Sequence, residues 1–188
     1  MAQRKQVIDS TVYQLKVTLR GSKPPIWRRL QVLSTTTLGQ LHLYLQEVMG
    51  WYNCHLHSFS INGIEYGQSG PDYGLELKNE KNVKLSQVVS REKFKFSYTY
   101  DFGDDWEHQI LVEKILPSHT ETQYPVCLKG KRACPPEDCG GIWGYGELLE
   151  VLGNPDHPEY EERLEWVGSI DPEEFDLDDI NDNLLGID

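Results

Sequence analysis

The sequence predicts one α+β domain in which a mixed or antiparallel sheet carries helices. Three observations predict it: apolar and polar residues alternate along several stretches, a stretch with helical spacing follows the first two of these, and helix-start signals recur toward the acidic end of the chain. Within the single domain, 1–188, we expect a sheet-and-helix core over 11–116, a Cys-, Pro- and Gly-rich crossover loop over 117–146 and an acidic helical end over 147–186 packed on the sheet.

The first two elements are predicted to be an antiparallel pair of strands. Over residues 12–19 apolar side chains recur at about every second position, which is the period of a strand with one buried face. A turn with glycine and proline at 21–25 leads into a second apolar stretch, 26–33. Trp27 and Arg28 begin this second strand and place a cation beside an aromatic ring.

An amphipathic helix is predicted next. Leu38, Leu41 and Leu45 recur at helical spacing, the Ser/Thr run before them offers N-caps, and Gly50 occupies the position of a C-cap. A third strand is expected over 55–61. The order of two strands, a helix and a strand is similar to that of the ubiquitin-type β-grasp.

Two further strands, 94–100 and 106–115, are predicted to flank a turn rich in aspartate. Asp101 and Asp104 lie in this turn, where carboxylates either bond their own backbone or hold a hard cation. The period of two places His108 on the apolar face of its strand. It is therefore either a core histidine or a ligand.

The acidic end contains helix-start signals that account for much of its charge. A polar cap with Pro158 behind it begins one helix, and Asp171 to Glu174 begin another with carboxylates in the first turn, where the helix dipole favours them.

The charge is distributed unevenly along the chain. The net charge is −12, yet residues 1–60 hold seven basic and two acidic residues, whereas residues 135–188 hold one basic and seventeen acidic. An acidic third repels phosphate backbones, so bulk nucleic-acid binding is disfavoured, although the basic N-terminal part could contact nucleic acid locally.

No stretch is apolar or long enough for a membrane span or a signal peptide. We therefore expect a cytoplasmic protein with no membrane partner. In that compartment the four cysteines are reduced thiols or metal ligands rather than a disulfide framework.

Histidine and cysteine side chains offer a candidate transition-metal site. In a strand, His55 and His57 point the same way and could ligate one ion; the alternative is a pair of hydrogen-bonded or edge-strand histidines. The three later cysteines lack the paired spacing of a zinc ribbon, so buried thiols are the alternative. The candidate ligands are His55, His57, His108, Cys127, Cys134 and Cys139.

The segment 133–146 combines two cysteines, two prolines and four glycines with Glu137, Asp138, Trp143 and Tyr145. A surface loop that only had to be soluble would not need two thiols and two large aromatic side chains. We expect this segment to join the acidic end to the sheet, and expect any site to lie where it meets the hairpin 100–108.

These segments together resemble the plasmid pRiA ORF-3-like family. The matching segments are 25–29, 55–59, 100–108, 134–141, 144–145, 154–159 and 171–176 with Trp166, and they extend over nearly the whole chain. The resemblance implies no settled biochemical activity and no catalytic residue.

The nucleotide-binding and hydrolase signatures with the best-understood mechanics are absent from the sequence. We therefore expect a binding or interaction module, without catalysis, that holds a protein, peptide or small ligand. The candidate binding residues are Trp27, Arg28, Asp101, Asp104, Trp106, Glu137, Asp138, Trp143 and Tyr145.

Two alternatives stay open at this level. The first is a metal-dependent hydrolase or nuclease, in which Asp101, Asp104 and His108 act with His55, His57 and Glu137 around a divalent metal, the only cofactor that the residues suggest. The second is an accessory protein of a mobile element that contacts nucleic acid through Arg20, Lys23, Arg28 and Arg29.

Overall fold

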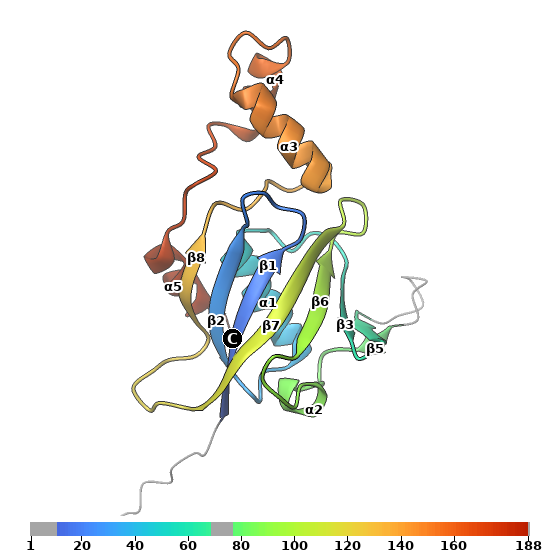
Figure 1. The fold of residues 1–188 in the computed structure, drawn as a ribbon, viewed down its shortest axis with the longest axis vertical. Helices are drawn as coiled ribbons and strands as arrows, with labels where there is room; N and C mark the ends of the chain where they lie inside the picture. The colour runs from blue at the N-terminus through green and yellow to red at the C-terminus, as the bar shows by residue number, and fades with distance from the viewer. Residues whose placement is uncertain (1–10, 69–76, 188) are drawn as a thin grey trace, which may run out of the picture.

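The computed structural model describes residues 11–68 and 77–187 and contains a mixed sheet of eight strands. The strand order across the sheet is β5-β4-β3-β6-β7-β1-β2-β8 (Figure 1). The α+β class predicted from the sequence is confirmed.

The N-terminal half of the sheet is the predicted hairpin. β1 (Thr11–Leu19) pairs antiparallel with β2 (Trp27–Leu33) on one side and with β7 (Trp106–Pro117) on the other. Alternate residues of β2, and of β1 from Leu15 onward, are buried, as the period of two predicts, whereas four consecutive residues are buried at 12–15 of β1.

The other half of the sheet contains four strands. β6 (Lys95–Tyr100) pairs antiparallel with β7 and with β3 (His57–Ile61), and β3 pairs with β4 (Ile64–Gly67). β4 pairs in parallel with the two-residue β5 (Lys78–Asn79), which makes the sheet mixed.

Helix α1 (Leu38–Met49) has the bounds predicted from its leucine spacing. Thr37 and Gln40 form a capping box at its start, and Gly50 ends it with a φ of 81°, a left-handed conformation that favours glycine. Its apolar face is buried against the sheet. A single-turn helix, α2 (Leu85–Val88), follows further along the chain. The chain does begin strand, strand, helix, strand, but the β-grasp arrangement is not confirmed.

The segment 117–146, predicted to be a crossover loop, also contains regular structure. It includes β8 (Val126–Lys131), which pairs with β2, and the first half of α3 (Gly141–Leu152). β8 escaped prediction because it is an edge strand with one buried side chain, Cys127, and therefore has no apolar alternation.

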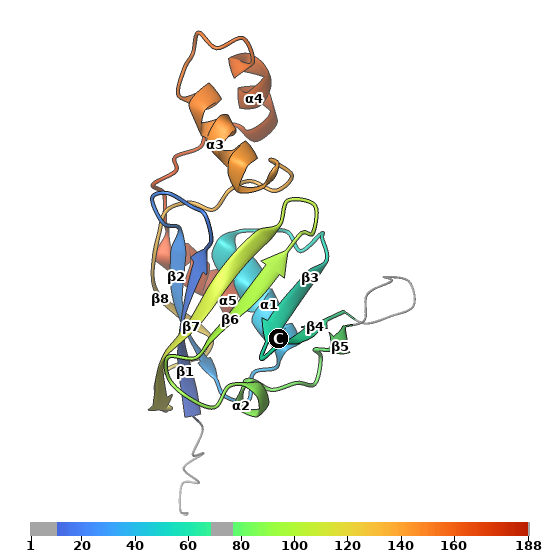
Figure 2. The ribbon, with the colours of Figure 1, turned by 45° about the vertical axis from the view of Figure 1, so that its right-hand side comes forward.

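The expectation that the C-terminal helices pack on the sheet holds for one of three. α5 (Leu177–Leu184) packs against α1 and β8, and Asn181 bonds both backbone groups of Cys127 at 2.8 and 3.0 Å. By contrast, α3 and α4 (Tyr160–Val167) pack on each other beyond the end of the sheet (Figures 1 and 2). None of the residues of α4 is buried. Within the described residues, no helix has the length and apolarity required to cross a membrane.

Two buried histidines make the core sensitive to acid. His108 is fully buried, and burial lowers its pKa to about 4. His42 lies on the buried face of α1, and burial together with the neighbouring His57 lowers its pKa to about 3. Both values lie below the ordinary histidine pKa of about 6.5. Between about pH 6.5 and pH 4 the unfolded chain therefore binds more protons than the folded chain, and stability falls as the pH is lowered.

We expect the fall from about pH 7 to about pH 5 to cost about 2 kcal/mol of unfolding free energy per buried histidine. Urea unfolding at both pH values measures this loss. The substitution His108→Leu should remove about half of it, whereas His119→Gln, at an exposed histidine, should leave it unchanged. An identical loss in wild type and His108→Leu would contradict the assignment.

Candidate metal centre

Three chain segments that are far apart in the sequence meet at one end of the sheet. The segment after α1 supplies Cys54 and His55, the β6–β7 turn supplies Asp101, and the segment before α3 supplies Glu137 and Asp138. We call these five residues the His55 cluster. The potential ligand atoms of Cys54, His55 and Glu137 lie within 4.8 Å of one another, and so do those of His55, Asp101 and Asp138.

The imidazole of His55 is the centre of the cluster. Its Nε2 lies 3.2 Å from Asp138 Oδ1, 3.8 Å from Asp101 Oδ2 and 3.8 Å from Glu137 Oε2. Although the side chain as a whole is 29% exposed, Nε2 itself is buried and makes no hydrogen bond of acceptable geometry. A buried nitrogen without a hydrogen bond normally costs stability, so its surroundings require an explanation.

In two of the carboxylates, hydrogen bonds hold one oxygen and the second oxygen lies toward His55; in Glu137 this second oxygen also accepts a hydrogen bond from the Cys54 thiol. Glu137 Oε1 accepts hydrogen bonds from the Tyr52 amide at 2.7 Å and from the Tyr100 hydroxyl at 3.0 Å. Asp101 Oδ1 accepts one from the Gly103 amide at 2.9 Å. The hydrogen bonds to the outer oxygens orient the inner oxygens, as outer-sphere bonds do for metal-binding carboxylates.

Tyr100 links the segment after α1 to Glu137 in the segment before α3. Its hydroxyl accepts the amide protons of Cys54, at 3.0 Å, and His55, at 3.3 Å, while it donates to Glu137. Burial, reinforced by the bond to Glu137, raises the pKa of Tyr100, so this hydroxyl keeps its proton.

The thiol of Cys54 points into the cluster and donates to Glu137 Oε2 at 2.6 Å. This hydrogen bond is the main reason that the pKa of Cys54 is raised. A thiol between carboxylates stays protonated until a cation replaces its proton.

The backbone of the cluster adopts conformations that non-glycine residues rarely take. Asn53, Asp101 and Asp138 have φ values of 55°, 55° and 58°. Each such residue costs of the order of 1 kcal/mol, and strained positions of this kind concentrate at functional sites. One of them lies in each of the three segments that form the cluster.

Contacts outside the cluster fix the position of the segment before α3. Trp51 Nε1 donates to the Pro135 carbonyl at 3.0 Å, and the Gly140 amide donates to Asp104 Oδ2 at 3.1 Å. Asp104 therefore anchors the segment rather than joining the His55 cluster.

The sequence and the fold are similar to those of known proteins. A family model described as plasmid pRiA4b ORF-3-like protein matches residues 11–179. The chain belongs to this family. It is 41% identical over 163 residues to the uncharacterized protein y4hQ of Sinorhizobium fredii, covering 86% of this chain and 84% of that one.

A solved relative supports the architecture of this pRiA4b ORF-3-like chain. The crystal structure of MM3350 from Methanosarcina mazei Go1, a protein of unknown function, superposes with a TM-score of 0.83 at 44% identity. The match covers 90% of this chain and 97% of that one. The family resemblance expected from the sequence motifs is confirmed.

Other histidines of this family member are engaged elsewhere. His57 Nε2 lies 2.9 Å from the buried carboxylate of Glu80, and its ring stacks on His42 with centroids 3.4 Å apart. These residues line a pocket of about 610 Å³ that also contacts Cys54 and His55. His108 packs among aromatic rings of the core, and its ring nitrogens have no hydrogen-bond partner of acceptable geometry.

The three later cysteines do not join His55. Cys127 is the buried side chain of β8, while burial raises the pKa of Cys134 and Cys139 to about 12 in each case. Among the described residues, none of the three belongs to a group of potential metal ligands. Cys127 is a buried thiol, the alternative that the spacing left open, whereas Cys134 and Cys139 are half-buried.

Four of the predicted binding residues are buried. Asp101 belongs to the His55 cluster, and the other three serve the fold. Arg28, Trp106 and Tyr145 are 3%, 1% and 7% exposed. Each side chain lies on the inward face of its strand or helix. The residue type alone does not predict this orientation. Trp27 is half-buried beneath Lys16 and Arg29, and Trp143 is 85% exposed.

The basic residues expected to contact nucleic acid also have internal roles. Arg29 pairs with Glu113 at 2.6 Å and Arg20 with Glu107 at 2.7 Å. Arg28 is buried, so three of the four basic residues are paired with a carboxylate or removed from the surface.

Sequence reasoning missed two residues of this arrangement, Cys54 and Tyr100. Cys54 directly precedes a predicted ligand, and Tyr100 begins the hairpin motif, so both were adjacent to recognised signals. Their roles depend on Glu137, which no local pattern connects to them.

Proposed function

We propose that this protein binds one divalent transition-metal ion at the His55 cluster. The observation that carries the proposal is the buried Nε2 of His55, without a hydrogen bond, faced by the inner oxygens of Asp101 and Glu137 and by Asp138. No Lys or Arg of the described residues forms an ion pair with these three carboxylates. A cation would therefore relieve both the repulsion among them and the isolation of Nε2.

The donor types favour an ion of the zinc class. Imidazole nitrogen and thiolate sulfur suit zinc, cobalt and similar ions, whereas magnesium and calcium prefer oxygen ligands alone. His55 belongs to both possible ligand groups, so we expect it to bind in either case, joined by Cys54 and Glu137 or by Asp101 and Asp138. The second group retains an exposed side because the Asp138 side chain is 68% exposed.

The test is metal binding by the full chain after treatment with a chelator. We expect one equivalent of Zn²⁺ or Co²⁺ to bind in calorimetry, and His55→Ala to weaken binding by at least about 100-fold, since it removes the ligand that both groups share. With Co²⁺, a sulfur-to-metal charge-transfer band that disappears in Cys54→Ser would show that the thiolate is a ligand.

The control is His119→Ala, which removes an exposed imidazole outside the cluster and should bind metal like the wild type. Substoichiometric binding by wild type, or equal affinity in His55→Ala, would refute the proposal. Binding that survives Cys54→Ser but not Asp101→Asn would assign the ion to the oxygen-rich group.

A hydrolase acting through this ion stays a prediction. An ion with an exposed side can lower the pKa of bound water and polarise a phosphoryl or carbonyl oxygen. Turnover of bis(p-nitrophenyl) phosphate by the zinc-loaded chain, absent from His55→Ala, would support it.

A further inference from the structure

The outer face of α3 is separate from the His55 cluster and has features of a binding surface. Trp143, Glu147 and Glu150 follow one another at spacings of four and three residues, so they lie on one face of the helix. Trp143 is 85% exposed, the second most exposed large apolar side chain among the residues that the structure describes. Helices α3 and α4 project beyond the end of the sheet, which leaves this face accessible (Figures 1 and 2).

An apolar groove borders this face on the side of the sheet. It has a volume of about 530 Å³ and lies between the β1–β2 turn and α3, with Pro24, Ile26, Ile142 and Leu149 among its lining residues. An exposed tryptophan beside an apolar groove is the arrangement that holds an apolar anchor of a partner, because tryptophan dominates binding energy at interfaces.

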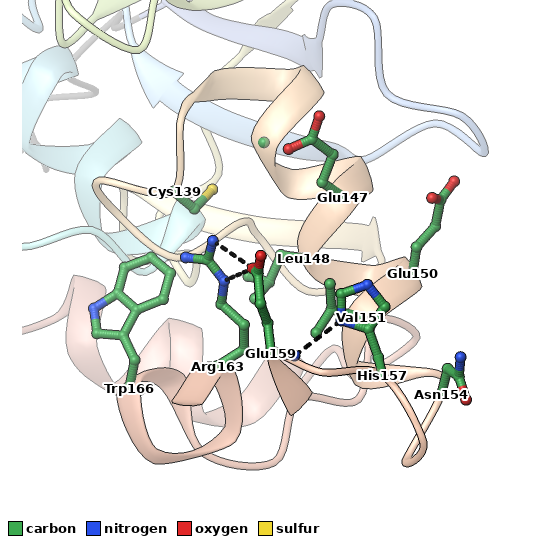
Figure 3. A pocket seen from close by; sticks show the side chains of 11 residues that line it. Cys139, Glu147, Leu148, Glu150, Val151, Asn154, His157, Glu159, Arg163 and Trp166 are labelled. Atoms are coloured by element: carbon green, nitrogen blue, oxygen red, sulfur yellow. Dashed lines mark hydrogen bonds and ion pairs between the residues drawn. The ribbon is translucent and has the colours of Figure 1, made fainter. Parts of the chain in front are cut away.

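A polar pocket of about 420 Å³ borders the same face on the side of α4 (Figure 3). Trp166, 47% exposed, forms one wall. Arg163 is held by Glu159 at 3.1 Å, so the cation of this pocket is already neutralised. The pocket thus offers carboxylates and an indole ring, and both attract a cationic side chain.

The two carboxylates on the face are unmatched. The groove beside them is also lined by Lys23, at the β1–β2 turn, and by Arg132, which pairs with Glu173. Residues 141–167, from the start of α3 to the end of α4, contain seven acidic side chains and Arg163 as the one basic residue. Glu147 and Glu150 are exposed, and neither forms an ion pair with any residue that the structure describes. A partner must therefore bring positive charge to this face.

We propose that the α3 face, defined by Trp143, Glu147 and Glu150 with its two flanking pockets, binds a basic amphipathic segment of another protein. Apolar side chains of that segment enter the groove beside Trp143, and its Lys or Arg side chains pair with Glu147 and Glu150. This is the helix-in-groove mode of recognition with charges on the rim. A second copy of this chain is disfavoured because it would bring two acidic faces together, and nucleic acid and anionic membranes are repelled.

The test is fluorescence anisotropy of labelled helical peptides with the full chain, in the presence of a chelator so that the His55 cluster plays no part. The probes are a Lys/Leu amphipathic peptide, a Lys/Ser peptide of equal charge and a Glu/Leu peptide. We expect the Lys/Leu peptide to bind at least about tenfold more tightly than the Lys/Ser peptide and to weaken as salt is added.

Substitutions on the α3 face test whether the peptide binds there. Trp143→Ala should weaken binding about tenfold, and because that side chain is exposed, the fold should not change. The double variant Glu147→Gln/Glu150→Gln should weaken binding more than the control Glu65→Gln/Glu121→Gln, which removes the same charge at exposed positions on β4 and in the β7–β8 loop.

Equal binding of the Lys/Leu and Lys/Ser peptides, or equal losses in the two double variants, would overturn the proposal in favour of a diffuse acidic field. Self-association of the chain without peptide, abolished by Trp143→Ala in sedimentation, would overturn it by identifying a second copy as the occupant. The outcome does not depend on metal binding.

Discussion

Replacing Arg28 with alanine is expected to lower the free energy of unfolding by about 3–5 kcal/mol. The side chain is 3% exposed, so its removal leaves a cavity. Its Nε donates to the Val48 carbonyl at 2.6 Å, and a terminal nitrogen donates to the carbonyls of Trp27, at 3.0 Å, and Lys131, at 3.1 Å. The substitution removes all three hydrogen bonds, of which the one to Val48 is buried, and this adds to the cost.

The position of Arg28 explains the size of this effect. Its three hydrogen-bond acceptors belong to the end of α1, to β2 and to β8, and its guanidinium lies 4.9 Å from the ring centroid of Phe175. Burial lowers the pKa of Arg28, which reflects the absence of a carboxylate partner among the described residues. The Arg28 side chain therefore contacts α1, β2, β8 and the segment just before α5.

Urea unfolding measures the change, and Arg20→Ala is the control. Arg20 pairs with Glu107 on the surface, with 52% of its side chain exposed, so its loss should cost less than about 1 kcal/mol. If Arg28→Ala and Arg20→Ala proved equally stable, the three carbonyl bonds of Arg28 would make no net contribution.

Replacing Gly144 with alanine is expected to destabilise the protein by about 3 kcal/mol, against the usual preference of helices for alanine. A Cβ at this position would lie 1.9 Å from the carbonyl oxygen of Cys139. That oxygen belongs to the backbone, so no side-chain rotation relieves the overlap. Since Cys139 directly follows Glu137 and Asp138, we also expect the affinity of the His55 cluster for metal to fall.

Gly146 provides the matched control in the same helix. A Cβ there meets no atom within 4 Å, so Gly146→Ala should stabilise the protein by about 0.5–1 kcal/mol. Urea unfolding of both variants, with zinc calorimetry, separates the outcomes. If Gly144→Ala were as stable as Gly146→Ala, the segment before α3 would move at no cost and its carboxylates would not be held in place.

Features that depend on neighbouring residues were predictable. Helix α1 forms at the predicted residues because its leucine spacing, its capping box and Gly50 all act within a few residues of one another. The β1–β2 hairpin follows from alternation and a turn in the same way. β8 was not predictable from the sequence. Only one of its side chains is buried, so its residues show no alternation, and it pairs with β2, which lies far away in the sequence.

His55 and His57 lie near the start of β3, and the alternation rule for strands did not predict their positions correctly. Alternation along a strand suggested that His55 and His57 share one ion, but β3 begins at His57, and His55 precedes it in irregular backbone. His57 therefore bonds to Glu80, while His55 faces Asp101, Glu137 and Asp138.

The sequence by itself determined the α+β class, the early hairpin and helix, the family and the acidic C-terminal third, because composition, period and motifs are properties of the chain. Tertiary structure alone decided that Arg28 is buried and that Cys54 contacts Glu137, 83 positions away. The physical reason is that such contacts form only when the strands of the whole sheet have paired. Before that, the residues concerned are too far apart to interact.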